Sequence, residues 1–403
     1  MTLSSATFEN LQNLRGSLNL ACLERTNIID GLLASIISQQ NAFLLGAPGT
    51  GKSDLVRKIT GAIAGARYFG YLLSPTSDPS ELFGPVKITK LMEDEYTRDT
   101  DGYLPDAHIA FLDELFRGNS AVLNSLLTIL NERQYHNGKT TIQTPLQSIV
   151  AATNSWPEEE SLQAFSDRFL FRPTVNFIQK PANKATLDAW GLGLVDRPEV
   201  GVLMTMQDLV ALQQEAKKLP VSEDFLEKFS GIWDHLATRN ITVSDRRRVQ
   251  ILRFLQAYAV VQGDDQLMPE HCHQTLEHMA YTTPDDQQVI RDVVEQEIPS
   301  ADRTVAVISR AASSVMQEFQ GLVNGSASRT QPGLSGLNDL AVKLTKNLKE
   351  MQVMQVKVGE ILDGSANMRV NFSTRDRAMK LATRIESNCE TIARAVAELR
   401  TTD

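Results

Sequence analysis

Hydrophobic residues occur along the chain in two patterns: short continuous runs, and longer stretches in which they return every three or four positions. Three continuous runs lie at residues 41–45, 108–114 and 148–154, and the last two end in polar side chains. Runs of this length are typical of strands buried on both faces of a parallel sheet. A helical spacing follows the first run at residues 54–59. The order of strand, loop and helix predicts an α/β fold.

The second half of the chain has the helical spacing almost throughout. It recurs at residues 206–212, 223–237, 246–261, 287–298 and 304–322. Beyond these, two seams with four-three spacing predict an antiparallel helical hairpin. Their apolar positions are Leu337, Ala341, Leu344, Leu348, Met351, Val358 and Leu362 in the first seam, and Met379, Ala382, Ile385, Cys389, Ile392, Val396 and Leu399 in the second.

Charge and composition change near residue 300. Residues 301–403 contain 14 basic and 11 acidic residues, a balance of +3, which leaves −12 for residues 1–300 of a chain with net charge −9. Residues 324–336 are rich in Gly, Ser, Pro and Asn, and this composition predicts a flexible linker. We therefore expect residues 301–403 to form a separate helical region.

Composition also excludes several classes of protein. A net charge of −9 gives no general attraction to nucleic acid or to anionic membranes, so nucleic acid is not an expected partner. The chain has no apolar run of about eighteen residues, and its first ten residues lack the regions of a signal peptide. The cysteines Cys22, Cys272 and Cys389 form no C-x-x-C pair, which suits a reducing compartment. These features predict a soluble, cytoplasmic protein.

The octapeptide GAPGTGKS at residues 46–53 follows the first predicted strand and fits the pattern G-x-x-x-x-G-K-[ST]. Glycines let such a loop curl so that backbone N–H groups point at a β-phosphate, while Lys52 reaches the β- and γ-phosphates and Ser53 binds Mg²⁺. An ordinary glycine turn is the alternative, but the strand before it and the helix after it favour a phosphate loop. ATP and Mg²⁺ are the expected cofactors. The predicted nucleotide-binding residues are Gly46, Ala47, Pro48, Gly49, Thr50, Gly51, Lys52, Ser53 and Asp54.

Polar side chains also end the other two predicted strands. Asp113 and Glu114 end the second, at the sheet edge where a phosphate loop lies in doubly wound folds. One carboxylate there can hold Mg²⁺ through water while the other polarises the attacking water, although a solvated pair is the alternative interpretation. Asn154 ends the third strand, where an amide can donate to a γ-phosphate or can simply close the strand with a turn.

Together with several further segments, these motifs resemble AAA+ ATPases of the MoxR family. The segments are DPSELFG at 78–84, the run from 111 to 134, VAATN at 150–154 and LQAFSDRF at 162–169. The phrases GYLPDAHIAFLDE at 102–114 and ILNERQYHNGK at 129–139 are most similar to the RavA group. The resemblance covers residues 20–300. It implies a P-loop NTPase core, a parallel sheet sandwiched by helices, in residues 1–180 and an all-α lid in residues 181–300.

The resemblance also implies roles for single residues. Lys52 and Ser53 bind phosphate and Mg²⁺, Asp113 binds the metal, and Glu114 activates water. Asn154 is then the sensor that reports the γ-phosphate.

Two arginines complete the family's pattern. Arg168 matches the arginine finger that reaches into the nucleotide site of the neighbouring subunit, a role that suits a permanently charged guanidinium. Arg246, with Arg247 as a near rival, matches a lid arginine that contacts the γ-phosphate of its own subunit. For Arg168 the alternative is a surface arginine at a helix end. For the triple arginine at 246–248 the alternative is a nucleic-acid patch.

Two segments bear on partners. Residues 84–105 alternate apolar and polar positions, which predicts a hairpin, and the family places a β-hairpin insertion here that projects towards the ring pore. Such an insertion would contact a substrate or only pack on its neighbours. Members of the RavA group carry a small β-domain after the lid, and nothing in residues 301–403 resembles it, so partners tied to that domain are not carried over.

The resulting hypothesis is a Mg²⁺-dependent ATPase that forms a homo-oligomeric, hexameric ring and remodels a protein partner. By analogy with the family, a protein with a von Willebrand factor A (VWA) domain is the expected partner. The alternatives are a nucleotide-gated scaffold that hydrolyses ATP slowly and a nucleic-acid-directed motor on the same fold. The intact pair Asp113 and Glu114, with Arg168, favours turnover.

Overall fold

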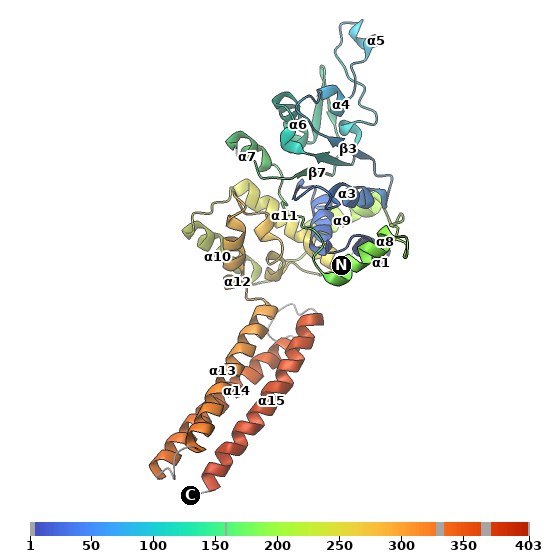
Figure 1. Cartoon of the computed structure of the whole chain (residues 1–403). Coiled ribbons are helices and arrows are strands. Elements are labelled where there is room, and N and C mark those ends of the chain that lie inside the picture. The colour runs from blue at the N-terminus through green and yellow to red at the C-terminus, as the bar shows by residue number, and fades with distance from the viewer. Residues whose placement is uncertain (1–4, 158, 328–333, 364–371, 402–403) are drawn as a thin grey trace. The chain divides into compact units, whose positions relative to one another are not determined.

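The computed structural model describes residues 5–157, 159–327, 334–363 and 372–401 (Figure 1). The chain divides into two compact units, residues 1–294 and residues 295–403, each with a hydrophobic core of its own. None of the described helices is both long and apolar enough to span a lipid bilayer.

The first unit is built around a parallel sheet. In spatial order its strands are β1 (Ala42–Leu45), β7 (Ser148–Thr153), β4 (Ile109–Asp113) and β3 (Tyr68–Leu72). On the other side of β1, parallel bridges from Ala42 to Phe171 and from Leu45 to Thr174 extend the sheet by one more segment. Every residue of β7 is buried, as expected for a strand covered on both faces. The predicted parallel α/β sheet is confirmed.

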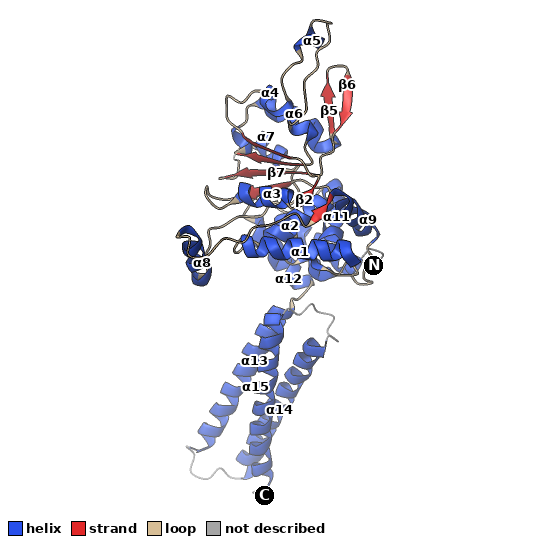
Figure 2. Cartoon of the chain, turned by 90° about the vertical axis from the view of Figure 1, so that its right-hand side faces the viewer, coloured by secondary structure: helices blue, strands red, loops and turns tan. Residues whose placement is uncertain are grey.

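Helices cover both faces of this sheet (Figure 2). One side carries α2 (Thr26–Ile37) and α3 (Lys52–Gly61), and the other carries α4 (Pro79–Phe83) and α6 (Ser120–Glu132). Val122, Leu126 and Ile129 recur on one face of α6 and share a buried core with Phe43 and Ile149 of the strands. The amino-terminal helix α1 (Ser5–Ala21) packs against α2.

A helical region follows the sheet. It contains α8 (Pro181–Gly191), α9 (Met206–Lys218), α10 (Phe225–Thr238), α11 (Asp245–Gln262) and α12 (Asp286–Glu297), with the short 3₁₀ helices η3 (Pro269–Cys272) and η4 (Leu276–His278). A strand pair, β2 (Ile63–Ala64) with β8 (Met204–Thr205), joins this region to the sheet domain. Helix α11 begins where the Ser244 hydroxyl accepts the Arg247 N–H, and it packs against α2 and α9.

Residues 84–105 form only part of the predicted β-hairpin. One antiparallel bridge joins Val86 to Arg98, the tip holds a single helical turn, α5 (Ile88–Leu91), and η1 (Leu104–Asp106) leads back to β4. A regular hairpin, which the sequence analysis missed, is formed by β5 (Gln134–Asn137) and β6 (Thr140–Gln143). Hydrogen bonds connect residues 84–105 to the β5–β6 hairpin: the Asn137 side chain accepts the Arg98 N–H and donates to the Arg98 carbonyl.

The second unit is a bundle of three long helices, α13 (Ala301–Ala327), α14 (Leu334–Asp363) and α15 (Phe372–Thr401). Predicted seam positions such as Met351, Val358 and Ile385 are buried in its core. Met379 is 49% exposed, however, and Ala378 is buried in its place. The predicted linker at 324–336 is partly helical, since residues 324–327 extend α13 and residues 334–336 begin α14, while residues 328–333 lie outside the described residues.

Candidate functional site

The phosphate-loop sequence, residues 46–53, connects the end of β1 to the start of α3. Gly49 and Gly51 have φ angles of +81° and +82°, a region that glycine enters without strain. At Gly46 a Cβ would lie 2.3 Å from the Val175 carbonyl oxygen, so no larger residue fits there. The motif's glycines are thus required by this backbone. The loop ends at a helix amino terminus, where free N–H groups and the helix dipole favour an anion.

Lys52 lies inside the loop and is only 7% exposed. Its Nζ donates to the carbonyl oxygens of Gly46 at 2.6 Å and Ala47 at 3.1 Å, so the ammonium group lies against the hollow of the loop. Burial lowers the Lys52 pKa, and the negative charges of Asp113 and Glu114 oppose that shift. A cation held in this way is suited to bind phosphate oxygens.

Asp113, Glu114 and Asn154 meet at the carboxyl edge of the sheet, beside the loop. Asp113 Oδ1 accepts the Glu114 N–H at 3.0 Å, and Asn154 Nδ2 donates to Glu114 Oε1. The Glu114 backbone is left-handed, with φ 51° and ψ 45°, and strained backbone of this kind clusters at functional sites. The structure therefore brings together four of the predicted site residues, with Lys52 as the fourth.

The residues at this edge fit a magnesium nucleotide. Ser53 offers a hydroxyl and Asp113 a carboxylate, the oxygen ligands that Mg²⁺ prefers. Within the described part of the chain, no group of three or more His, Cys, Asp or Glu side chains is placed to hold a metal by itself. Magnesium held by one or two protein oxygens together with substrate phosphates and water is the usual arrangement in phosphoryl-transfer sites.

Arg168 lies at the opposite edge of the sheet. It follows α7 (Glu160–Ser166), and its carbonyl oxygen accepts a hydrogen bond from the Asn41 side chain at 3.3 Å. Asn41 directly precedes β1, and its Oδ1 accepts the Ile149 N–H at the start of β7. Since four strand residues span about 13 Å, the length of β1 separates Arg168 from the phosphate loop of its own chain.

Arg246, at the start of α11, lies at this same amino edge. Its Nη2 donates to Asn131 Oδ1 at 3.2 Å, and its side chain lines one cavity of about 640 Å³ with Arg168 and residues 38–41. The resemblance implied that Arg246 contacts the γ-phosphate of its own subunit. In the structure Arg246 lies across the sheet from its own phosphate loop, an arrangement that favours a role towards a neighbouring subunit.

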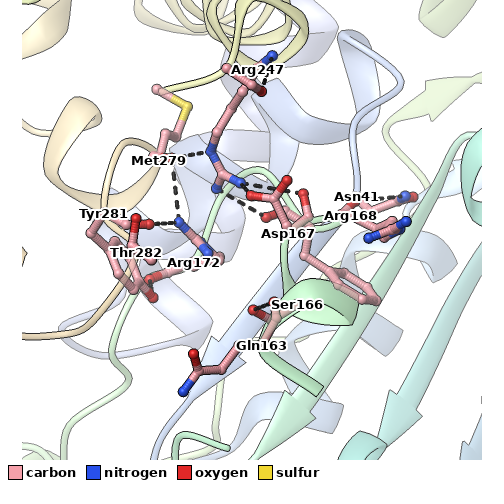
Figure 3. Close-up of polar contacts among 12 residues, drawn as sticks. Asn41, Gln163, Ser166, Asp167, Arg168, Arg172, Arg247, Met279, Tyr281 and Thr282 are labelled. Atoms are coloured by element: carbon pink, nitrogen blue, oxygen red, sulfur yellow. Dashed lines mark hydrogen bonds and ion pairs between the residues drawn. The ribbon is translucent and has the colours of Figure 1, made fainter. Parts of the chain in front are cut away.

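Arg247, the alternative to Arg246 as the lid arginine, is buried and makes only internal contacts among the described residues (Figure 3). It is 4% exposed, its Nη1 pairs with the Asp167 carboxylate, and its Nε donates to the Met279 carbonyl oxygen at 2.6 Å. These contacts fix the start of α11 to the residue beside Arg168. Of the two candidates, only Arg246 therefore has an exposed side chain.

A second buried arginine, Arg172, was missed by the sequence analysis because a pattern of apolar positions does not reveal a buried cation. Its guanidinium lies 4.1 Å from the ring centre of Tyr281 and 5.6 Å from that of Trp156. It also donates a hydrogen bond to the Tyr281 carbonyl (Figure 3). Burial, with the nearby charge of Arg247, lowers the Arg172 pKa to about 9. Trp156, two residues after Asn154, thus packs against both Arg172 and Tyr281.

Two family models match the chain. The model described as the MoxR domain in the MoxR-vWA-beta-propeller ternary systems matches residues 9–214, and a model of the AAA lid domain matches residues 224–294.

Three curated proteins are similar in sequence. Two uncharacterised proteins of Methanocaldococcus jannaschii are similar over most of their length: MJ0812 is 38% identical over 277 residues, which is 68% of this chain and 72% of the relative, and MJ0079 is 36% identical over 291 residues, or 72% and 75%. The structural protein ORF618 of Acidianus two-tailed virus is 29% identical over 217 residues, or 50% of this chain and 35% of that protein.

The fold is also found among solved structures. A Cytophaga hutchinsonii protein, provisionally described as an ATPase, superposes with a TM-score of 0.59 at 17% identity, over 72% of this chain and 94% of its own. At that identity the likeness concerns the fold alone.

Proposed function

The chain belongs to the MoxR family of AAA+ ATPases, and on this basis we propose that it hydrolyses ATP in a ring of copies, with each active site shared by two neighbours. By analogy with AAA+ proteins the ring has six copies. The residues of one chain then supply two different half-sites, which we call the loop edge (Lys52, Ser53, Asp113, Glu114 and Asn154) and the arginine edge (Arg168 and Arg246).

At the loop edge, Lys52 and the N–H groups of the loop bind the phosphates. Ser53 and Asp113 would hold Mg²⁺, which when bound would supply positive charge to stabilise the phosphate oxygens. Glu114 takes a proton from a water molecule as the water oxygen bonds to the γ-phosphorus. The bond from the γ-phosphorus to its bridging oxygen breaks, and ADP and phosphate leave. Asn154, which donates to Glu114, holds that carboxylate in position.

A single observation carries this proposal: the two half-sites lie at opposite edges of one sheet. Arg168 is tied to Asn41 at the amino edge, whereas Lys52 and Glu114 lie at the carboxyl edge. A chain therefore cannot bring its own Arg168 to its own nucleotide. A neighbouring copy can, and a guanidinium there stabilises the charge that gathers on the γ-phosphoryl group.

Subunit mixing tests this arrangement. Glu114→Gln removes the base but keeps the arginine edge, and Arg168→Ala removes the finger but keeps the loop edge. Each variant alone should be nearly inactive, whereas random mixing in equal amounts should restore about a quarter of the wild-type sites. Arg239→Ala, an exposed lid arginine, is the matched control and should keep full activity. Mixed rings without any recovered ATPase activity would contradict a shared site.

For the work done by the ATPase, we propose remodelling of a protein partner with a VWA domain. The support is the description of the matching family model, which places MoxR domains in systems with vWA proteins. Glu114→Gln held in ATP should capture such a protein, and release it when nucleotide is removed. Capture of nucleic acid instead would favour a nucleic-acid motor. A wild-type turnover no faster than that of Glu114→Gln would favour a nucleotide-gated scaffold.

A further inference from the structure

The cavity at the arginine edge holds more positive charge than the two proposed residues supply. Its volume is about 640 Å³, and besides Arg168 and Arg246 it is lined by Arg133 and Arg253. Glu132 is the only acidic residue among those that line it. The lining thus contains four arginines and one acidic residue, in a chain whose net charge is −9.

Three of these arginines have no anionic partner of their own. Across the described ranges, Arg133, Arg246 and Arg253 form no ion pair; Arg246 contacts the Asn131 amide, and Arg133 Nη2 donates to the Gln39 carbonyl oxygen at 2.9 Å. Arg133 Nη1 is enclosed and has no hydrogen-bond partner in the part of the chain that the structure describes. Burial lowers the Arg133 pKa to about 10, so the group is still charged at neutral pH. Clustered cations that lack carboxylates favour the binding of an anion from outside.

The lid helix presents two of the arginines in line. Arg246 and Arg253 are seven positions apart on α11, with Gln250 between them, so they lie on one face of the helix about 10 Å apart along its axis. Arg133 and Arg168 come from the opposite wall, formed by the ends of α6 and α7. The spacing suits an extended chain of phosphates better than a single phosphate.

We infer that Arg253 and Arg133, together with Arg168 and Arg246, receive the triphosphate bound to the loop edge of the neighbouring copy. This inference rests on the proposed shared site, because Arg168 lines the same cavity. A triphosphate matches the charge of the cavity, and guanidinium groups bind phosphate oxygens through two parallel hydrogen bonds. Arg253 has an exposed side chain and can reach a second copy, whereas Arg133 forms the fixed wall.

The test places Arg253→Ala in one or the other member of the mixing pair. Each active site of the mixed ring combines the loop edge of an Arg168→Ala chain with the arginine edge of a Glu114→Gln chain. Arg253→Ala in the Glu114→Gln chain therefore removes this arginine from the active sites. In the Arg168→Ala chain, the same change lies on the subunit that supplies the loop edge. The structure predicts a loss of about tenfold in the recovered kcat/KM for ATP in the first mixture and no loss in the second.

Other outcomes separate the inference from the proposed function. If Arg253→Ala lowered the recovered activity in neither mixture, or lowered it equally in both, the role of Arg253 would be overturned while the shared site stands. Failure of the parent pair to recover activity would instead overturn the shared site. Arg253→Lys in the first mixture keeps the positive charge but cannot form two parallel hydrogen bonds to phosphate oxygens, and it should recover part of the loss. Arg239→Ala in either chain should change neither mixture.

Discussion

At the residue scale, two glutamates with left-handed backbones differ in how many hydrogen bonds their carboxylates accept, and this difference determines their roles. Glu24 has φ 57° and Glu114 has φ 51°. Glu24 accepts hydrogen bonds from the N–H groups of Gln179 and Lys180 and from the Asn183 side chain. Glu114 accepts one from Asn154. Glu24 is therefore a structural acceptor at the start of α8, whereas Glu114 keeps acceptor capacity for a water molecule.

The Glu24 contacts predict a pH-dependent stability. The Gln179 N–H, the Asn183 side chain and the Lys180 N–H lower the Glu24 pKa to about 2, from 4.5. Because the folded-state pKa is depressed, this stabilisation is present above about pH 4.5 and is lost as the pH falls towards about 2. Glu24→Gln should thus lower the urea midpoint at pH 7, and the difference from the wild type should narrow in acid. A difference that stays constant from pH 7 to pH 3 would rule this out.

At the scale of elements, helix α11 has two different faces near its start. Arg246 and Arg253 face the cavity, whereas Arg247 is buried against Asp167 and Met279. Adjacent arginines can differ in this way because successive helix residues point about 100° apart. The buried side chain of Arg247 holds α11 against Asp167, the residue before Arg168. The face with Arg246 and Arg253 is left open to the cavity and to a ligand.

Removing the buried contact should separate these two roles. Arg247→Met keeps much of the volume but removes the 2.6 Å hydrogen bond to the Met279 carbonyl, which keeps only the longer one from Arg172 Nη2 at 3.5 Å, and it leaves Asp167 without its ion pair. We therefore expect the free energy of unfolding of the first unit to fall by about 2–4 kcal/mol. Arg246→Ala, its neighbour, should leave stability unchanged within about 0.5 kcal/mol while it abolishes most ATPase activity. Urea unfolding and steady-state turnover of both variants provide the measurements. A stable Arg247→Met protein would show that Arg247 does not join the lid to Asp167.

These elements also show which parts of the fold the sequence could predict. Strands β1, β4 and β7 were predicted because each is a continuous buried run, and polar residues at their ends indicated the loop edge. Hairpin β5–β6 was missed, although Asn137-Gly138 is a turn signal, because its exposed strands carry little apolar pattern. The position of Arg246 at the amino edge could not be predicted, because it depends on contacts between residues far apart in sequence, such as Arg246 with Asn131, which no local pattern encodes.

At the scale of the whole molecule, the two units should unfold independently. One core gathers around Phe43, Leu112 and Ile149 of the sheet, and the other lies among the three helices of the bundle. All residues of both proposed half-sites belong to the first unit. The chain should therefore show two transitions, and changes in the bundle core should move only one of them.

Asn347 on α14 offers the sharpest test of this independence. It is 1% exposed, and its amide nitrogen has no hydrogen-bond partner among the described residues. Because an unpaired buried amide costs about 1–3 kcal/mol, Asn347→Leu should raise the midpoint of the bundle transition and leave that of the first unit unchanged. Asn347→Ala is the control, since it removes the amide but opens a cavity, and should not raise the midpoint as far. A shift of both transitions together would show that the units unfold as one.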